Sequence, residues 1–132
     1  MESQLRAYLI AWLAADAVLA GSVNAIEEES PVKVSAPWIG IAASASTDWS
    51  VKDRTGREVR IALELMDRSD DPLETAATVL LIEQRIAAFM PADAPFELVS
   101  TTFLRSRAER RPRSQRAVLL EYSFRAFEQA AA

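Results

Sequence analysis

Strict alternation of apolar and polar residues is clearest in two stretches of the chain. In the first stretch the apolar positions are Val59, Ile61, Leu63 and Leu65, and the positions between them include Glu58, Arg60 and Glu64. In the second stretch they are Val118, Leu120, Tyr122, Phe124 and Ala126. Because successive side chains of a strand point to opposite faces, each stretch predicts a β-strand with one face on a core and the other on water or another subunit.

Two weaker patterns predict further strands, at Pro37–Ala42 and at Phe96–Arg105, the latter followed by the strand Ala117–Phe127. The polar segment Ser44–Arg57 contains the turn residues Asp53 to Gly56 and predicts the tip of a long hairpin. The arginine-rich connection between the last two strands predicts a second hairpin.

Helical spacing of apolar residues predicts one helix over Ser3–Ala20, ending at Gly21. The apolar run Ala7–Ala20 also has the look of a secretion signal, but Asp16 interrupts it and Arg6 is its one basic flank, which favours a buried amphipathic helix. The segment Ser22–Ser35 predicts a loop or an irregular edge strand, in which Val32 and Val34 form a short strand.

A second helix is predicted to begin at Asp71, which would cap it, with Pro72 and Glu74 in its first turn and Pro91 marking its end. Its expected inward stripe is Leu73, Ala76, Ala77, Leu80, Leu81, Ile86 and Phe89. The element order predicts an α+β fold with an antiparallel or mixed β-sheet, two α-helices packed on one face, and two long projecting hairpins.

Length and composition limit the possible functions. With 132 residues, half of them hydrophobic and 26% charged, the chain is expected to form one globular domain over residues 1–132. It contains no cysteine and no histidine, which excludes thiol chemistry, histidine-based catalytic pairs and the usual zinc sites. The net charge of −4 argues against a dedicated nucleic-acid binder. No glycine-rich phosphate loop is present, and no cofactor is expected.

An acidic group is the best candidate for a metal site in this chain. It consists of Asp67, Asp70, Asp71 and Glu74, and calcium or magnesium would need several such oxygen ligands. Its spacing matches no calcium loop, and helix capping explains the same residues without a metal. The capping interpretation is therefore favoured over the metal site.

The second predicted hairpin is strongly basic. Its arginines are Arg105, Arg107, Arg110, Arg111, Arg113 and Arg116, and Glu109 is the one acid among them. A protein partner is the favoured interpretation, ahead of a solvated turn and of nucleic acid, because guanidinium groups pair with carboxylates and no aromatic residues for base stacking lie between them. In the first hairpin, Trp49 either lies at an interface or folds back on its own hairpin, and the sequence leaves both open.

The order and spacing of several short motifs resemble the tail-terminator, or tail-completion, family of long-tailed phages, in the branch found in prophages and gene transfer agents. The likeness runs from about Leu5 to Phe127. The motifs are Leu5-Arg6-Ala7, Leu13-Ala14-Ala15-Asp16, Ala36-Pro37-Trp38-Ile39, Asp48-Trp49-Ser50, Gly56-Arg57-Glu58, Asp67-Arg68, the helix from Pro72 and the strand Leu119 to Ala126. The chain departs from many relatives in Glu27-Glu28-Glu29 and in the arginine density of its last hairpin.

The resemblance implies a virion structural protein and not an enzyme: a subunit of a six-membered ring that caps the tail tube and joins it to the head-side connector or stopper protein. It implies assembly from the bacterial cytoplasm without a membrane, and it allows DNA to pass through the ring without sequence-specific binding. A head-to-tail contact closes such a ring when its rotation is right. The residues expected at the interfaces are Asp48, Trp49, Ser50, Lys52, Arg54, Arg57, Arg107, Arg110, Arg111 and Arg113.

Two rival functions stay open from the residues themselves. The first is a free-standing dimeric binding module with a small-molecule pocket and no virion role. The second is a metal-dependent enzyme that uses Asp67, Asp70 and Asp71, although neither a base nor a nucleophile is evident.

Overall fold

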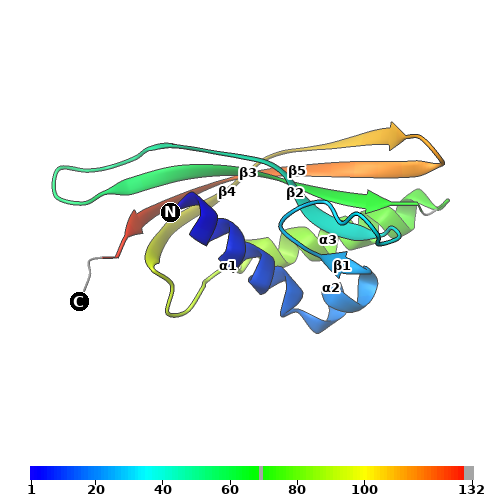
Figure 1. Ribbon diagram of the computed structural model, residues 1–132, viewed down its shortest axis with the longest axis horizontal. Helices are drawn as coiled ribbons and strands as arrows, with labels where there is room; N and C mark the ends of the chain where they lie inside the picture. The colour runs from blue at the N-terminus through cyan, green and yellow to red at the C-terminus, as the bar shows by residue number, and fades with distance from the viewer. Residues whose placement is uncertain (69, 130–132) are drawn as a thin grey trace.

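The computed structural model describes residues 1–68 and 70–129, and in these residues five strands form one sheet with three helices on one of its faces (Figure 1). The strands are β1 (Ala25–Ile26), β2 (Trp38–Asp48), β3 (Gly56–Asp67), β4 (Phe96–Arg111) and β5 (Gln115–Glu128). Their order is β1-β2-β3-β5-β4. β1 pairs parallel to β2, and the other neighbours pair antiparallel. The predicted α+β class is confirmed, and the sheet is mixed.

The core lies between the sheet and the helices. On the sheet side it is formed largely by the inward side chains of β3 and β5, the two alternating stretches. The apolar side chains of β3 from Val59 to Leu65 are at most 1% exposed, and Leu120, Phe124 and Ala126 of β5 are fully buried. Leu5, Leu9 and Leu13 of helix α1 (Glu2–Ala14) are fully buried against them. Period-two patterning therefore identified the inward face of both strands.

The predicted helix Ser3–Ala20 is wrong as a single element. α1 ends at Ala14, and a second helix, α2 (Ala17–Ser22), begins after Asp16. Asp16 has an extended backbone, and its carboxylate accepts hydrogen bonds from the N–H groups of Val18 and Leu19 at 3.0 and 3.1 Å. Because a carboxylate that caps N–H groups starts a helix, Asp16 divides the apolar run, and Gly21 lies inside α2.

Several strand bounds also differ from the predictions. Val32 and Val34 form no strand, and Val32 is 95% exposed; the short strand β1 precedes them. β2 continues to Asp48, so the tip of the first hairpin is shorter than Ser44–Arg57. β4 continues to Arg111, six residues beyond the predicted end, because its ladder with β5 runs to the pair Arg111 and Gln115.

The start of helix α3 (Pro72–Ala87) is confirmed, and its inward stripe is confirmed in part, since Ile86 and Phe89 are buried as predicted. Asp71 accepts a hydrogen bond from the Leu73 N–H at 2.9 Å and caps the helix. The buried residues are Thr75, Ile82 and Ile86, whereas Leu73 is 77% exposed and Leu80 is 53% exposed. The buried Thr75 hydroxyl donates to Asp67 at 2.8 Å, and this bond turns the first turns of α3 so that the leucines point outward.

Candidate functional site

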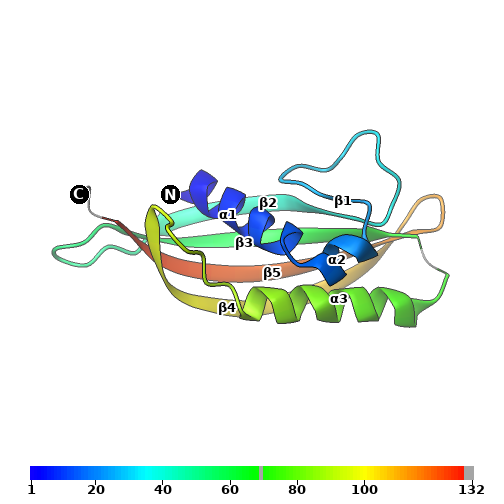
Figure 2. The same cartoon turned by 90° about the horizontal axis from the view of Figure 1, so that it is seen from below.

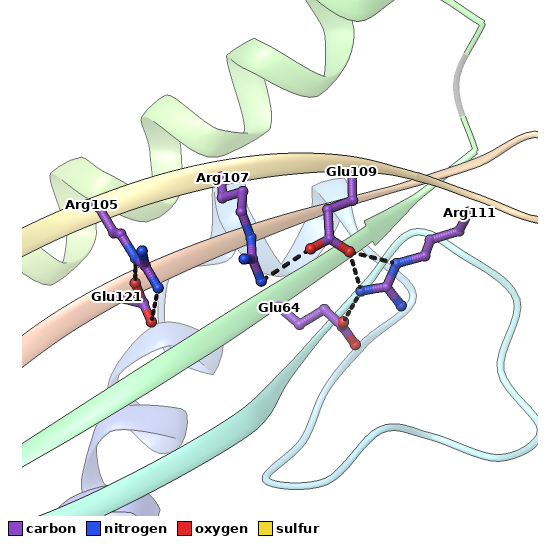
Figure 3. A network of polar contacts seen from close by, with 6 residues as sticks. All are labelled: Glu64, Arg105, Arg107, Glu109, Arg111 and Glu121. Atoms are coloured by element: carbon purple, nitrogen blue, oxygen red, sulfur yellow. Dashed lines mark hydrogen bonds and ion pairs between the residues drawn. The ribbon is translucent and has the colours of Figure 1, made fainter.

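The face of the sheet opposite the helices, called the outer face here, is covered by charged side chains. They stand at the positions of β3, β4 and β5 that alternate with the buried ones, and Figure 3 shows part of the array. The array comprises Glu58, Arg60, Glu64, Arg105, Arg107, Glu109, Arg111, Glu121 and Arg125. Each charge of the array has an opposite charge within ion-pair distance, so the outer face is internally compensated.

The pairs join residues within β4 and residues of different strands of the sheet. Arg111 of β4 lies 3.4 Å from Glu64 of β3 and 3.0 Å from Glu109, which Arg107 also approaches at 3.0 Å (Figure 3). Arg105 pairs with Glu121 on β5. Cross-strand pairs of opposite charge stabilise a sheet modestly and fix its register.

These contacts shift the pKa values of the carboxylates involved. The hydrogen bond from Arg60 lowers the pKa of Glu58, and a second one from Arg125 lowers it further. Arg105 in the same way lowers the pKa of Glu121, and the Arg105 pKa is raised in return. The lowered pKa values favour the ionised form of Glu58 and Glu121.

The tip of the first hairpin packs on the molecule's own strands. The Trp49 ring stacks on Phe127 of β5 at 5.0 Å between centroids, and the Arg54 guanidinium lies 4.4 Å from the Phe127 ring centre. Arg54 also forms an ion pair with Glu97 at 2.8 Å. Of the two alternatives for Trp49, the structure therefore shows the one in which it folds back on its own chain.

The other predicted residues of this hairpin have different places. The Ser50 hydroxyl donates to Asp48 at 2.6 Å and accepts from the Gly56 N–H at 3.0 Å, so both residues shape the turn. Lys52 is exposed at the tip. Arg57 lies on the helix side of the sheet, beside the polar hollow that Glu2 and Ser46 also line.

The predicted second hairpin is confirmed, but the strands run further into its arginine-rich part than expected and leave only a short turn. Arg107, Arg110 and Arg111 lie in β4, and Arg113 lies in the turn with a φ of 64°. Arg107 and Arg111 pair with acids of the outer face. In the described residues no ion pair involves Arg110 or Arg113. Both side chains are exposed at the end of this hairpin.

The two hairpins lie at opposite ends of the long sheet (Figure 1). The predicted interface residues therefore do not form one continuous surface. What the sequence did not indicate is the apolar flank beside β4, where α3 lies along the sheet edge (Figure 2). Six of the nine large apolar side chains that are exposed in the described residues lie on α3, shortly after it or on β4: Leu73, Leu80, Met90, Val99, Phe103 and Leu104.

The acidic group at the start of α3 is a structural element. Asp71 caps the helix, and the buried Asp67 accepts from Thr75 and from the Arg68 N–H at 2.7 Å. Arg116 donates to the Thr75 hydroxyl at 2.9 Å and completes this cluster. Capping is therefore confirmed for Asp71. Within residues 1–68 and 70–129 no three acidic side chains gather in a metal-binding arrangement.

A shallow hollow of about 440 Å³ lies on the outer face, floored by Ala43, Ala45 and Ala62 and bordered by Leu104, Arg105 and Glu121. The hollow forms because the alanine side chains of β2 and β3 are much shorter than the charged side chains of β4 and β5 beside them. In the described residues no helix has the length and hydropathy needed to cross a membrane.

A family model and a solved structure both match nearly the whole chain. The family model described as tail completion protein gp17 matches residues 7–127. A chain of a structure titled "Virion of native gene transfer agent (GTA) particle" superposes with a TM-score of 0.76 at 20% identity, over 93% of this chain and 94% of that one. At this identity the superposition shows a shared fold. Among curated proteins, none matches the chain.

Proposed function

Because this chain belongs to the tail completion protein gp17 family, we propose that it is the tail terminator of a phage or gene-transfer-agent particle. Six copies form a ring that caps the tail tube, stops its growth and joins it to the head-side connector. The ring assembles from subunits in the bacterial cytoplasm and then remains in the virion at the head-to-tail junction.

The family match over residues 7–127 carries this proposal, and the shape of the molecule supports it. A long sheet with a hairpin at each end can contact one axial partner at each end. The outer face holds its charges in internal pairs, and the described residues contain no cluster suited to metal chemistry. The proposed role is therefore one of surface recognition, without catalysis and without a cofactor.

The predicted interface residues divide between two kinds of contact in this proposal. Lys52 at the first tip and Arg113 at the second are placed to meet axial partners, the tube on one side and the connector on the other. Trp49, Arg54, Arg107 and Arg111 act indirectly, because their packing and ion pairs hold the hairpins in shape.

Deletion of the gene in a particle-producing strain tests the function directly. Electron micrographs should show unjoined heads together with tails of abnormal length, and a plasmid copy should restore joined particles. Normal particles from the deletion strain would overturn the proposal. A purified chain that stays dimeric beside the tube protein and binds a small molecule in the outer-face hollow would instead favour the binding-module function.

A further inference from the structure

Both long edges of the sheet are unpaired over most of their length. β1 pairs with β2 only at Trp38 and Ile39, and two further backbone bonds reach as far as Ile41. On the other edge, β4 pairs with β5 alone among the described strands. An edge strand presents unpaired N–H and C=O groups, which can pair with a strand of another chain.

The β2 edge lacks the features that usually prevent such pairing. The seven residues from Ile41 to Thr47 include no charge and no proline. The Trp49 N–H donates to the Gly56 carbonyl oxygen at 3.0 Å, so Trp49 turns its backbone groups toward β3. Because these groups alternate along a strand, Ser44, Ser46 and Asp48 direct theirs toward the open side.

The β4 edge is the apolar side of the molecule. Val99, Phe103 and Leu104 are 49%, 49% and 42% exposed, and they lie on the free half of β4. Exposed apolar patches of this kind mark protein interaction sites. The pairing partners across β3 and β5 connect the open segment Ala43–Asp48 of β2 to Leu98–Arg105 of β4. The two segments therefore lie at the same height along the strands.

The two edges also match in direction and charge. The pairings β2–β3, β3–β5 and β5–β4 are all antiparallel, so β4 runs antiparallel to β2. If β4 of one copy lies beside β2 of the next, the two strands pair antiparallel and both copies keep the same orientation. The exposed Glu27 to Glu29 lie along β2 near Ile39 and Ile41, level with the Ser106–Ala108 part of β4. Side-by-side copies would thus bring the acidic segment of one near Arg110 of its neighbour.

We infer that the free edge of β2 in one copy pairs antiparallel with the free edge of β4 in the next copy. This inference rests on the ring proposed above and specifies its subunit contact: a head-to-tail strand pairing that repeats until the ring closes. Each copy uses one edge for each neighbour, so the closed assembly has no open edge left to bind further copies.

Cysteine pairs test the contact on a chain that has no cysteine of its own. Ala45 of β2 and Thr102 of β4 both lie on the outer face. They are at the same height along the strands, because Ala45 pairs with Arg60, Arg60 with Ser123, and Ser123 with Thr102. Directly opposed residues of an antiparallel pair have Cβ atoms about 4.5–5.5 Å apart, within reach of oxidative cross-linking. A chain carrying Ala45→Cys is mixed with chains carrying Cys at Ser100, Thr102 or Arg105, beside the tail tube protein of the same particle.

We expect a cross-linked dimer with one of the three β4 positions, strongest at Thr102. A chain carrying both Ala45→Cys and Thr102→Cys should give a ladder that stops at the ring size. The matched control is Ala62→Cys, which lies on the same face but in β3, inside the sheet, and should give none. Ring formation is scored separately by mass and by micrographs.

Rings without any of these cross-links would overturn the strand pairing and leave the tail-terminator function intact. Absence of rings beside the tube protein would overturn both. A second test changes the backbone of the β2 edge. Ser46→Pro removes the N–H group that faces the open side, and an edge strand tolerates proline there. Ser46→Ala keeps this N–H group and is the matched control. Ser46→Ala should form rings and Ser46→Pro should remain folded but single; rings from both variants would contradict the pairing.

Discussion

Trp12 of α1 and Arg85 of α3 bind each other through two reciprocal hydrogen bonds. The Trp12 indole N–H donates to the Arg85 carbonyl oxygen at 2.8 Å, and Arg85 Nε donates to the Trp12 carbonyl oxygen at 2.8 Å. The guanidinium also lies 3.7 Å from the indole ring centre. The two helices that cover the sheet are thus joined to each other as well as to the core.

The Arg85→Ala variant should lose this connection. A hydrogen bond from a charged donor and a cation–π contact are together worth about 2–4 kcal/mol, so the free energy of unfolding should fall by roughly 2 kcal/mol or more. Urea denaturation measures the change. Gln84→Ala, at the exposed neighbouring position of α3, is the control and should change stability by less than about 0.5 kcal/mol.

Gly56 is required where the first hairpin closes. A Cβ atom there would lie 2.6 Å from the Trp49 carbonyl oxygen and 3.0 Å from the Phe127 ring. Gly56→Ala should therefore lower the midpoint of thermal unfolding and disturb the Trp49 stack, which the tryptophan fluorescence reports. Gly21→Ala meets no atom within 4 Å and lies in α2, so it should raise stability by about 0.5–1 kcal/mol. Equal effects of the two substitutions would contradict this account.

Arg110 and Arg113 should matter for assembly and little for folding. The double variant Arg110→Glu, Arg113→Glu leaves the ion pairs of Arg107 and Arg111 in place, so the chain should keep its circular dichroism spectrum. Head-to-tail joining should be lost, as measured by counting joined particles in micrographs.

Arg111→Glu is the contrasting variant, because it breaks the contacts with Glu64 and Glu109 and should destabilise the chain itself. The single variant Arg110→Glu should impair ring formation, and adding Glu27→Arg and Glu29→Arg to it should restore rings if these charges face each other between copies. Full joining activity in the double variant would remove both arginines from the mechanism.

Acidification should reduce the stability that the ion pairs of the outer face contribute. The pKa of Glu58 lies below its usual value of 4.5, first because of the hydrogen bond from Arg60, so its contribution to stability is present above pH 4.5 and is lost as pH falls through the folded-state pKa. Glu58→Gln should therefore flatten the fall in unfolding free energy on acidification. Denaturation curves at several pH values measure this, and the same steepness in both proteins would show that Glu58 is not responsible.

The ionisation of Tyr122 should lower the stability of the protein at high pH. Burial raises its pKa to about 12, from 10.0, and nearby Glu83 adds to the shift. The folded state keeps the phenol neutral while the unfolded chain ionises, so this contribution is intact below pH 10 and is lost as pH rises from 10 toward 12. Tyr122→Phe should retain its ring contacts with Phe103 and Phe124 and should lose less stability over this range.

The sequence predicted those parts of the fold in which local pattern and burial agree. Val59 to Leu65 and Val118 to Ala126 alternate with period two, and the structure buries the expected face of each. Capping by Asp71 was predicted from the residue types alone and is confirmed. For α3 the prediction was right at Ile86 and Phe89 and wrong at Leu73 and Leu80. The buried stripe starts at Thr75, and spacing could not show this because its hydrogen-bond acceptor, Asp67, belongs to β3.

The candidate site was less predictable for a topological reason. β5 lies between β3 and β4, although it follows β4 in the chain. That insertion makes β4 an edge strand and brings the side chain of Arg111 within 3.4 Å of Glu64, 47 residues away in the chain. Neither the free edges nor the internal pairing of the arginines follows from spacing, so the hairpin appeared more basic than it is.

The sixteen residues of β4 span about 50 Å at roughly 3.3 Å per residue. If neighbouring copies join edge to edge, the strands of the closed sheet tilt from the central axis, and the wall of the collar reaches somewhat less than the length of this strand. Each subunit would then reach the structures above and below the collar at the same time. Docking of tail to head could proceed on a rigid spacer, with no need for a subunit to change shape as the second partner arrives.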